Sequence, residues 1–193
     1  MINLILFGPP GAGKGTQSAK LIEKYSLTHI STGDLFRKHL KEGTPLGKLA
    51  QDYMNKGNLV PDKVVIDMVD DKITHSGKIG GIIFDGFPRT IPQAQALDKL
   101  LSEKKAPIKV LIELVVPEDE LRNRLADRAV KENRPDDAKP AVIENRISVY
   151  KAETAAVADY YKKSNQYASV IGVGKVEDIF KNICVEIEKR LLA

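Results

Sequence analysis

The sequence predicts an α/β protein whose five parallel strands form one sheet with helices on both faces. Short apolar runs alternate along the chain with longer segments in which apolar residues recur every three to four positions. Such alternation of strand and helix is typical of a doubly wound sheet. A length of 193 residues suits a single domain with one sizeable core.

The order of the elements follows from these patterns. Strands are expected at residues 2–7, 28–30, 82–85, 108–116 and 169–173. Helices are expected at residues 14–24, 62–73, 92–101, 118–129, 141–162 and 176–192, with a further pair between 34 and 56. Residues 31–60 are largely helical and residues 131–140 form a polar loop that contains proline. We expect both stretches to be mobile flaps over an edge of the sheet or, alternatively, plain connections.

Composition excludes several classes of protein. Hydrophobic residues make up 42% and charged residues 29% of the chain, which is ordinary for a globular protein. The single cysteine, Cys184, can form neither an internal disulfide nor a thiolate metal cluster, so we expect no structural zinc and a cytoplasmic location. Cys184 belongs to a helical apolar stripe with Ile183 and Ile187, so we expect it in the core. No run approaches the ~20 apolar residues of a membrane span. We attribute the net charge of +4 to a lysine-rich surface in preference to a nucleic-acid partner.

The arginines are more informative than the net charge. The chain has 8 Arg against 22 Lys, and five of the eight lie between positions 122 and 146. A guanidinium group binds phosphate oxygens through a planar fork, whereas lysine acts as a point charge. This cluster therefore indicates a phosphate site.

Helical geometry sorts these arginines. Arg128 lies about 20° and Arg124 about 60° from the leucine face of their helix, whereas Arg122 points away. Arg146 lies within the apolar stripe of the next helix. An inward cation needs an anion, which is either a bound phosphate, the interpretation we favour, or the aspartate pair at residues 136–137.

The strongest motif is GPPGAGK at residues 8–14, which follows a strand and leads into a helix. Its glycines let backbone N–H groups point at phosphate oxygens, the helix N-terminus adds a favourable dipole, and Lys14 reaches the outer phosphates. The hydroxyl that usually follows the lysine comes one residue later, at Thr16 after Gly15. A nucleotide-binding core of the P-loop NTPase type is expected.

A second motif supplies an acidic group at the end of a neighbouring strand. Asp85 ends the run IIFD, where its carboxylate would hold Mg²⁺ through water or, alternatively, only cap the strand. Gly86 then allows a ligand to approach closely, and Arg89 projects from the carboxyl edge of the sheet, where ligands of such sheets bind.

Together these residues resemble the adenylate kinase family over essentially the whole chain. The motifs that carry the resemblance are the phosphate loop with its shifted threonine, STGD at residues 31–34 with Arg37, FDGFPRT at residues 84–90, the pair Arg124 and Arg128, RPDD at residues 134–137, and Arg146. The resemblance implies reversible, direct in-line transfer of the γ-phosphoryl group from Mg·ATP to AMP, giving two ADP, in adenine-nucleotide homeostasis.

The resemblance also implies a role for each matching residue. The ATP side would comprise Gly11, Ala12, Gly13, Lys14, Gly15, Thr16, Arg124, Arg128 and Gly174. The AMP side would comprise Thr32, Arg37, Asn58, Leu59, Val60, Gly86, Phe87, Pro88, Arg89 and Gln93, with Arg134 and Arg146 bridging the phosphates. The catalytic set would be Lys14, Arg89, Arg128, Arg134 and Arg146. Mg²⁺, arriving as Mg·ATP, would be held by Thr16 and, through water, by Asp85.

The same resemblance divides the domain. A core of residues 1–30, 61–126 and 138–193 would carry a nucleoside-monophosphate-binding flap at residues 31–60 and a lid at residues 127–137. The resemblance implies a lid of the short form without a zinc-bearing insertion, although ENRP at residues 132–135 stands where the family usually has a Ser-Gly-Arg step. We expect a cytoplasmic monomer that binds ATP, AMP and ADP but neither nucleic acid nor membrane.

Three other functions fit less well. A UMP/CMP kinase shares the phosphate loop, but Thr32 and Thr90 differ from the residues of the pyrimidine branch. A GTPase is disfavoured because NKGN at residues 55–58 only approaches the guanine-reading motif and lies too early in the chain. A nucleic-acid-binding module is disfavoured by the low aromatic content of 6% and by arginines on inward helix faces.

Overall fold

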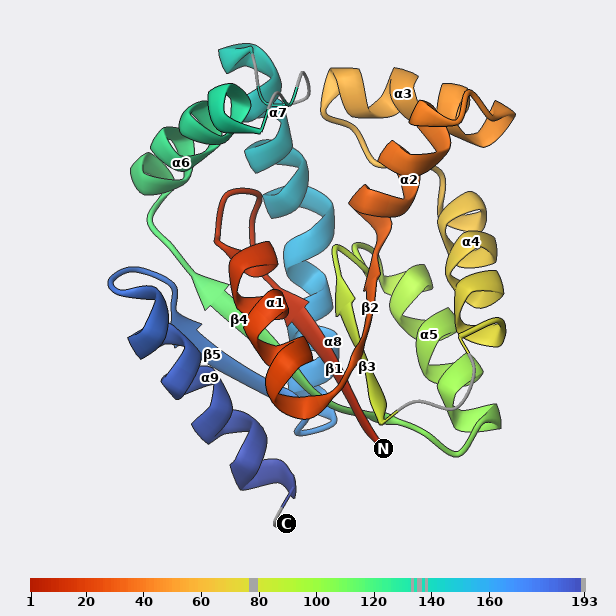
Figure 1. The fold of residues 1–193 in the computed structure, drawn as a ribbon, viewed down its shortest axis with the longest axis vertical. Coiled ribbons are helices and arrows are strands. Elements are labelled where there is room, and N and C mark those ends of the chain that lie inside the picture. The colour runs from red at the N-terminus through yellow and green to blue at the C-terminus, as the bar shows by residue number, and fades with distance from the viewer. Residues whose placement is uncertain (77–79, 133, 135–136, 138, 192–193) are drawn as a thin grey trace.

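A five-stranded parallel sheet lies between two layers of helices in the computed structural model, which describes residues 1–76, 80–132, 134, 137 and 139–191 (Figure 1). The strands are β1 (Ile2–Phe7), β2 (Thr28–Ser31), β3 (Gly81–Asp85), β4 (Ile108–Val115) and β5 (Tyr167–Ile171). The helices are α1 (Lys14–Tyr25), α2 (Thr32–Lys41), α3 (Pro45–Lys56), α4 (Asp62–Thr74), α5 (Ile91–Glu103), α6 (Glu118–Lys131), α7 (Pro140–Val149), the π-helix η2 (Tyr150–Thr154), α8 (Ala155–Lys163) and α9 (Val176–Leu191). The expected fold class is confirmed. None of the helices that the structure describes is long and apolar enough to cross a bilayer.

Local sequence signals fix where several helices begin and end. The hydroxyl of Thr44 accepts a backbone hydrogen bond in the first turn of α3, and Pro45 occupies the first helical position. Thr90 caps α5 in the same way, accepting from the backbone N–H of Gln93 at 3.3 Å. Gly57 ends α3 in the left-handed conformation that favours glycine. These caps lie beside the segments that later form the site.

Two elements differ from the sequence-based expectation. Strand β5 was expected two residues further along, at residues 169–173, but the run ends at Ile171, before glycines that include Gly174 with a φ of 117°. The helix expected at residues 141–162 is interrupted by η2, one wide turn between α7 and α8. A π turn adds a residue to one turn, so the apolar period alone does not reveal it.

The strand order β2-β3-β1-β4-β5 places a switch point beside β1. The connection that leaves β1 runs to the β2 side of the sheet, whereas the connection that leaves β3 runs to the β4 side. A crevice forms at the carboxyl ends of strands whose connections diverge in this way. Leu6 of β1 and Ser31 of β2 are both in register with Asp85, so the ends of three strands meet there.

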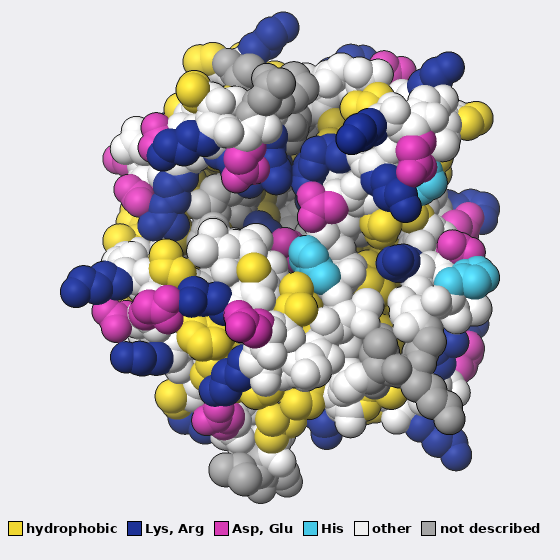
Figure 2. All heavy atoms as spheres, in the orientation of Figure 1, with side chains coloured by type: hydrophobic (Ala, Val, Ile, Leu, Met, Phe, Trp, Pro, Cys, Tyr) yellow, Lys and Arg dark blue, Asp and Glu magenta, His cyan; other side chains and the backbone are white. Residues whose placement is uncertain are grey.

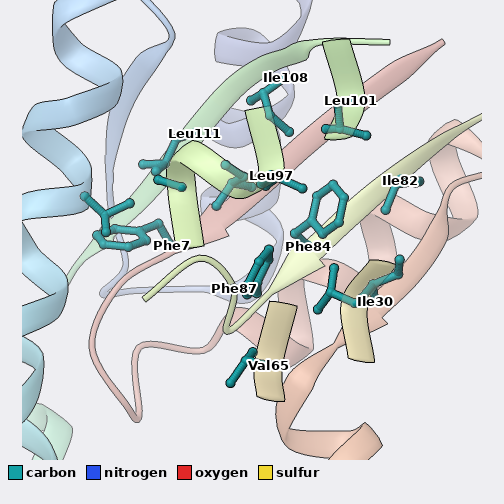
Figure 3. Close-up of a cluster of buried hydrophobic side chains, with 14 of the residues drawn as sticks. Phe7, Ile30, Val65, Ile82, Phe84, Phe87, Leu97, Leu101, Ile108 and Leu111 are labelled. Carbon is teal, nitrogen blue, oxygen red and sulfur yellow. The ribbon is translucent and has the colours of Figure 1, made fainter. Parts of the chain in front are cut away.

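Side chains that alternate along β1 feed two separate cores. Ile5 and Phe7 pack with α4, α5 and α8, in the cluster drawn in Figure 3. Leu4 and Leu6 pack on the opposite face with α1, α6, α7 and α9. Cys184 lies in this second cluster at 5% exposure, which confirms its expected place in the core. The sheet is thereby buried on both faces, as continuous apolar strands require.

Candidate active site

A cleft of about 660 Å³ opens at the carboxyl ends of β1 and β3. The phosphate loop forms its floor, with α6 and α7 on one side and α2 and α3 on the other (Figure 1). Figure 2 shows the hollow between these two groups of helices, with Lys and Arg side chains around it. All of the site residues that the sequence predicts line this cleft except Ala12 and Gly174.

The phosphate loop connects β1 to the N-terminus of α1. Gly11 has a φ of 84°, and a Cβ there would lie 3.0 Å from a backbone carbonyl oxygen of α6, so both conformation and space require glycine. The backbone N–H of Ala12 donates to the carbonyl of Pro9 at 3.2 Å, and its methyl group is buried, which is why it does not line the cleft. The ammonium of Lys14 folds back across the loop and donates to the carbonyl oxygens of residues 8 and 9 at 2.9 and 3.0 Å.

Lys14 lies in a field of mostly positive charge. Burial lowers the pKa of its ammonium to about 8; the Asp85 carboxylate opposes this shift, and the guanidinium groups of Arg89, Arg128 and Arg146 reinforce it. A bound anion would raise this pKa again, because it would pair with the ammonium and offset the positive charge of the arginines. The loop is therefore arranged to take up negative charge.

Asp85 lies at the carboxyl end of β3 with its side chain 14% exposed. Its Oδ2 is 3.8 Å from Nε2 of His29, a nitrogen that is buried without a hydrogen-bond partner. Asp85 and the hydroxyl of Thr16 both line the cleft. Carboxylate and hydroxyl oxygens are the ligands that Mg²⁺ takes alongside water and phosphate oxygens, so this donor set suits that ion.

The segment after β3 is tied to the start of α2 and α5. The hydroxyl of Thr32 donates to the carbonyl of Gly86 at 2.7 Å, and Nε of Arg89 donates to the same oxygen at 2.8 Å. Oε1 of Gln93 accepts from the backbone N–H of Arg89 at 2.7 Å, while its Nε2 donates to Asp62 at 2.8 Å. Gln93 is only 1% exposed, and these two bonds set the orientation of its amide. Phe87 and Pro88 complete this wall.

The arm formed by α2 and α3 contributes a charged pair and a short extended stretch. Arg37 pairs with Asp34 one turn earlier on α2. Burial opposes ionisation of Asp34, but the guanidinium outweighs it and holds the pKa of that carboxyl below its usual range. Residues 58–60, which follow α3, line the cleft beside this pair.

On the side of the cleft formed by α6 and α7, the arginines form ion pairs with carboxylates of the protein. Asp137 is fully buried and receives Arg128, at 2.6 Å between Nη2 and Oδ2, together with Arg146. Arg134 pairs with Glu132 at 2.7 Å. The protein thus forms the internal ion pair that the sequence left open as the alternative to phosphate; Asp136 lies outside the described residues.

Arg124 approaches the cleft from α6 and also holds the loop after β5. Its Nη1 donates to the carbonyl of Gly172 at 3.0 Å, and its Nε donates to Glu120 at 2.7 Å. Gly174, two residues further along that loop, does not line the cleft. Arg122 points away from the cleft, as expected, and pairs with Glu144 at 2.6 Å.

Sequence reasoning gave no role to several residues that line the cleft, among them Asp34 of the STGD motif. Asp34 carries a readable signal, because an acid three residues before Arg37 on a helix predicts a pair. Tyr150 and Thr154 line the cleft from η2, and no local pattern announces that wide turn. The hydroxyl of Tyr150 donates to Glu113 of β4 at 3.0 Å, which fixes the wall to the sheet.

Comparison with known proteins agrees with this geometry. The family model described as adenylate kinase matches residues 6–166. An adenylate kinase of Bacteroides thetaiotaomicron is 44% identical over 189 residues, covering 98% of this chain and all of the relative. Those of Parabacteroides distasonis and Thermodesulfovibrio yellowstonii are 46% and 41% identical, covering 95% and 98% of this chain and 96% and 100% of the relatives. The chain therefore belongs to the adenylate kinase family, whose members convert ATP and AMP into two molecules of ADP.

Proposed function

We propose that this cleft transfers the γ-phosphoryl group directly, in line, from ATP bound along residues 11–16 to AMP bound against residues 31–60. The observation that carries the proposal is the convergence of five cations from separate segments on one cleft, namely Lys14, Arg89, Arg128, Arg134 and Arg146. All of the reacting groups are anionic phosphates, so fixed positive charge stabilises the charge that builds up during transfer.

On the ATP side, backbone N–H groups of the loop and the ammonium of Lys14 would bind the phosphates. Arg128 would contact them from α6, and Arg124 would stack against the adenine base, near the loop that contains Gly174. The two carbonyl oxygens that the ammonium now contacts support this role of Lys14, because phosphate oxygens would take their place as acceptors.

On the AMP side, Arg37 and Arg89 would bind the phosphate, while Thr32 and Gln93 would read the base. The hydrogen bond that Gln93 donates to Asp62 and the one that it accepts from the backbone N–H of Arg89 support a fixed amide orientation, which base recognition needs. Residues 58–60, with residues 86–88 opposite, would lie along the nucleoside. Arg134 and Arg146 would bridge the two phosphate groups.

Mg²⁺ enters as part of Mg·ATP, the form that the family uses. Thr16 would bind the ion directly and Asp85 through water, and the hard oxygen donors of both residues support this assignment. When bound, the ion neutralises charge on the phosphates and orients them. No group of three or more His, Cys, Asp or Glu suited to a metal lies within the described part of the chain.

Transfer to AMP needs no general base, because the attacking oxygen is already anionic. Water is the competing acceptor, so the chain's task is to assemble the site only when both nucleotides are bound. We propose that residues 31–60 and 127–137 act as the two closing segments around a core of residues 1–30, 61–126 and 138–193. Opening of the closed complex would then limit turnover.

We propose further that the lid is the short form without zinc. The match to the Thermodesulfovibrio relative runs over 215 residues, more than this chain has, so that relative carries residues that have no counterpart here. A single cysteine in the whole chain also supports a lid without thiolate ligands. A monomeric state and a cytoplasmic location remain predictions, and sedimentation tests the first.

A coupled assay of ADP formation from Mg·ATP tests the proposal, with AMP, CMP, UMP and GMP offered separately and a control without acceptor. We expect strong selectivity for AMP and almost no turnover without an acceptor. Equal turnover without an acceptor would mean that water reacts and that closure does not protect the site.

Two variants test the charge argument in the same assay. Lys14→Ala and Arg89→Ala should each lower kcat by at least about 10²-fold, since each removes a cation aimed at the reacting phosphates. Arg122→Ala serves as the matched control, because this arginine points away from the cleft, and it should keep wild-type turnover. Near-normal activity in either cleft variant would contradict the assignment.

A further inference from the structure

The end of α3 is fastened to the middle of α7 by one side chain. Nδ2 of Asn145 donates to the backbone carbonyl of Lys56 at 2.6 Å and to Oδ1 of Asn58 at 2.9 Å. The two helices contact each other, and both lie near the upper edge of the view in Figure 1. We call the group formed by Lys56, Gly57, Asn58 and Asn145 the clasp.

The contact uses groups that need partners. Lys56 is the last residue of α3, where helical carbonyls have no partner within the helix. A primary amide has two N–H donors, so Asn145 serves this carbonyl and the side chain of Asn58 at once. The bonds join residues 89 and 87 positions apart in the chain. They are therefore tertiary hydrogen bonds between the two sides of the cleft, and neither belongs to the internal hydrogen bonding of a helix.

Gly57 allows the close approach that the clasp requires. A Cβ at this position would lie 2.9 Å from Cγ of Arg146 and 3.0 Å from the carbonyl oxygen of Val142. Its φ of 75° is also in the left-handed region. A side chain here would push α3 away from α7.

The clasp lies beside two residues that line opposite sides of the cleft, Asn58 and Arg146, although Asn145 itself does not line it. Asn58 follows α3, and Arg146 is the neighbour of Asn145 on α7. We propose that Asn145 is a positioning residue that ties the AMP-binding segment to α7 and so favours the closed arrangement in which Asn58 and Arg146 face the same substrate. This inference rests on the proposed placement of AMP against residues 31–60.

The proposal separates binding of AMP from the transfer step. When only a fraction of the protein holds the competent arrangement, apparent affinity falls by that fraction. Loss of the clasp therefore weakens AMP binding without changing the groups that carry out transfer. The KM for AMP rises, whereas kcat at saturating AMP and the KM for ATP stay close to wild type.

Asn145→Ala tests this split. We expect the KM for AMP to rise about tenfold, as the loss of two hydrogen bonds implies, with kcat and the KM for ATP within about twofold of wild type. Ser148→Ala, an exposed residue of the same helix outside the clasp, is the matched control and should leave all three constants unchanged. A wild-type KM for AMP in Asn145→Ala overturns the proposal.

A pair of glycine variants separates the contact from backbone strain. Gly57→Ala and Gly43→Ala both place a side chain at positive φ, 75° and 67°, but a Cβ at Gly43 meets nothing within 4 Å. Both variants should lose thermal stability. Only Gly57→Ala should also raise the KM for AMP, and an equal rise in Gly43→Ala would attribute the effect to strain and overturn the proposal.

A distance measurement tests the clasp without relying on activity. Spin labels on cysteines at exposed Gln51 of α3 and Ala141 of α7 report the separation, and buried Cys184 is shielded from the label. We expect Asn145→Ala to shift the nucleotide-free distribution to longer distances and AMP to restore it. An unchanged distribution overturns the clasp. A longer distance with a raised KM for ATP in place of AMP keeps the clasp but overturns the AMP assignment on which the proposal rests.

Discussion

Replacing Asp137 with asparagine removes the carboxylate charge that Arg128 and Arg146 share. Asp137 is 0% exposed, and the two guanidinium side chains are 25% and 17% exposed. Breaking a fully buried ion pair costs about 3–5 kcal/mol, whereas an exposed pair contributes at most about 1 kcal/mol. With the arginines mostly but not fully buried, we expect Asp137→Asn to lower the free energy of unfolding by about 2–3 kcal/mol. For a chain of this size that corresponds to a fall in Tm of about 5–10 °C.

Thermal unfolding followed by circular dichroism, with and without saturating Mg·ATP, measures this effect. If phosphate takes the place of the carboxylate, nucleotide supplies the missing anion, and the difference in Tm between variant and wild type should shrink by about half. Glu144→Gln is the control, because it breaks the exposed pair with Arg122 and should change Tm by no more than about 1 °C.

Two results would refute this reasoning. A Tm for Asp137→Asn within about 1 °C of wild type would show that the buried pair contributes nothing to stability. An equal loss with and without nucleotide would show that the arginines do not exchange the carboxylate for phosphate.

Three further predictions concern other groups. Burial lowers the pKa of Lys14 to about 8, so the free protein loses this positive charge as the pH rises through 8. The Kd for ATP should therefore increase from pH 7 to pH 9. Binding of ATP should also take up protons, which calorimetry in two buffers with different ionisation enthalpies can show. Asp85→Asn should raise the Mg²⁺ concentration needed for half-maximal activity, and an unchanged magnesium titration would contradict the metal assignment. Tyr161→Phe should lower stability by about 1–2 kcal/mol in urea, since it removes a 3.0 Å hydrogen bond to half-buried Asp98, while activity stays at the wild-type level.

Most of the fold could be predicted from the sequence because it depends on local pattern. The apolar run of β1 has the predicted bounds, and the helix predicted at residues 14–24 ends one residue later in the structure. Strand β5 was displaced because glycines on its far side, among them Gly174, stop the strand earlier than hydropathy suggests. The π turn of η2 depends on tertiary contacts, such as the bond from Tyr150 to Glu113, which no local period encodes.

In the candidate site, too, local motifs could be predicted from the sequence, whereas contacts between distant segments could not. Motifs near one strand end, such as the phosphate loop and the segment around Arg89, could be located because the carboxyl ends of parallel strands meet. The partner of Arg128 could not be chosen from sequence, since phosphate and Asp137 both satisfy an inward cation. The bonds from Asn145 to Lys56 and Asn58 were invisible for a simpler reason: they depend on how two distant helices pack.

The central position of β1 affects how the chain is made. Both neighbours of β1 come late, because β3 begins at Gly81 and β4 at Ile108. At a synthesis rate of about 5–20 residues per second, the first strand waits about 4–16 s for a partner. During that interval β1 has no neighbouring strand with which to pair. The phosphate loop, which directly follows β1, therefore takes its final shape only after β3 and β4 have been synthesised.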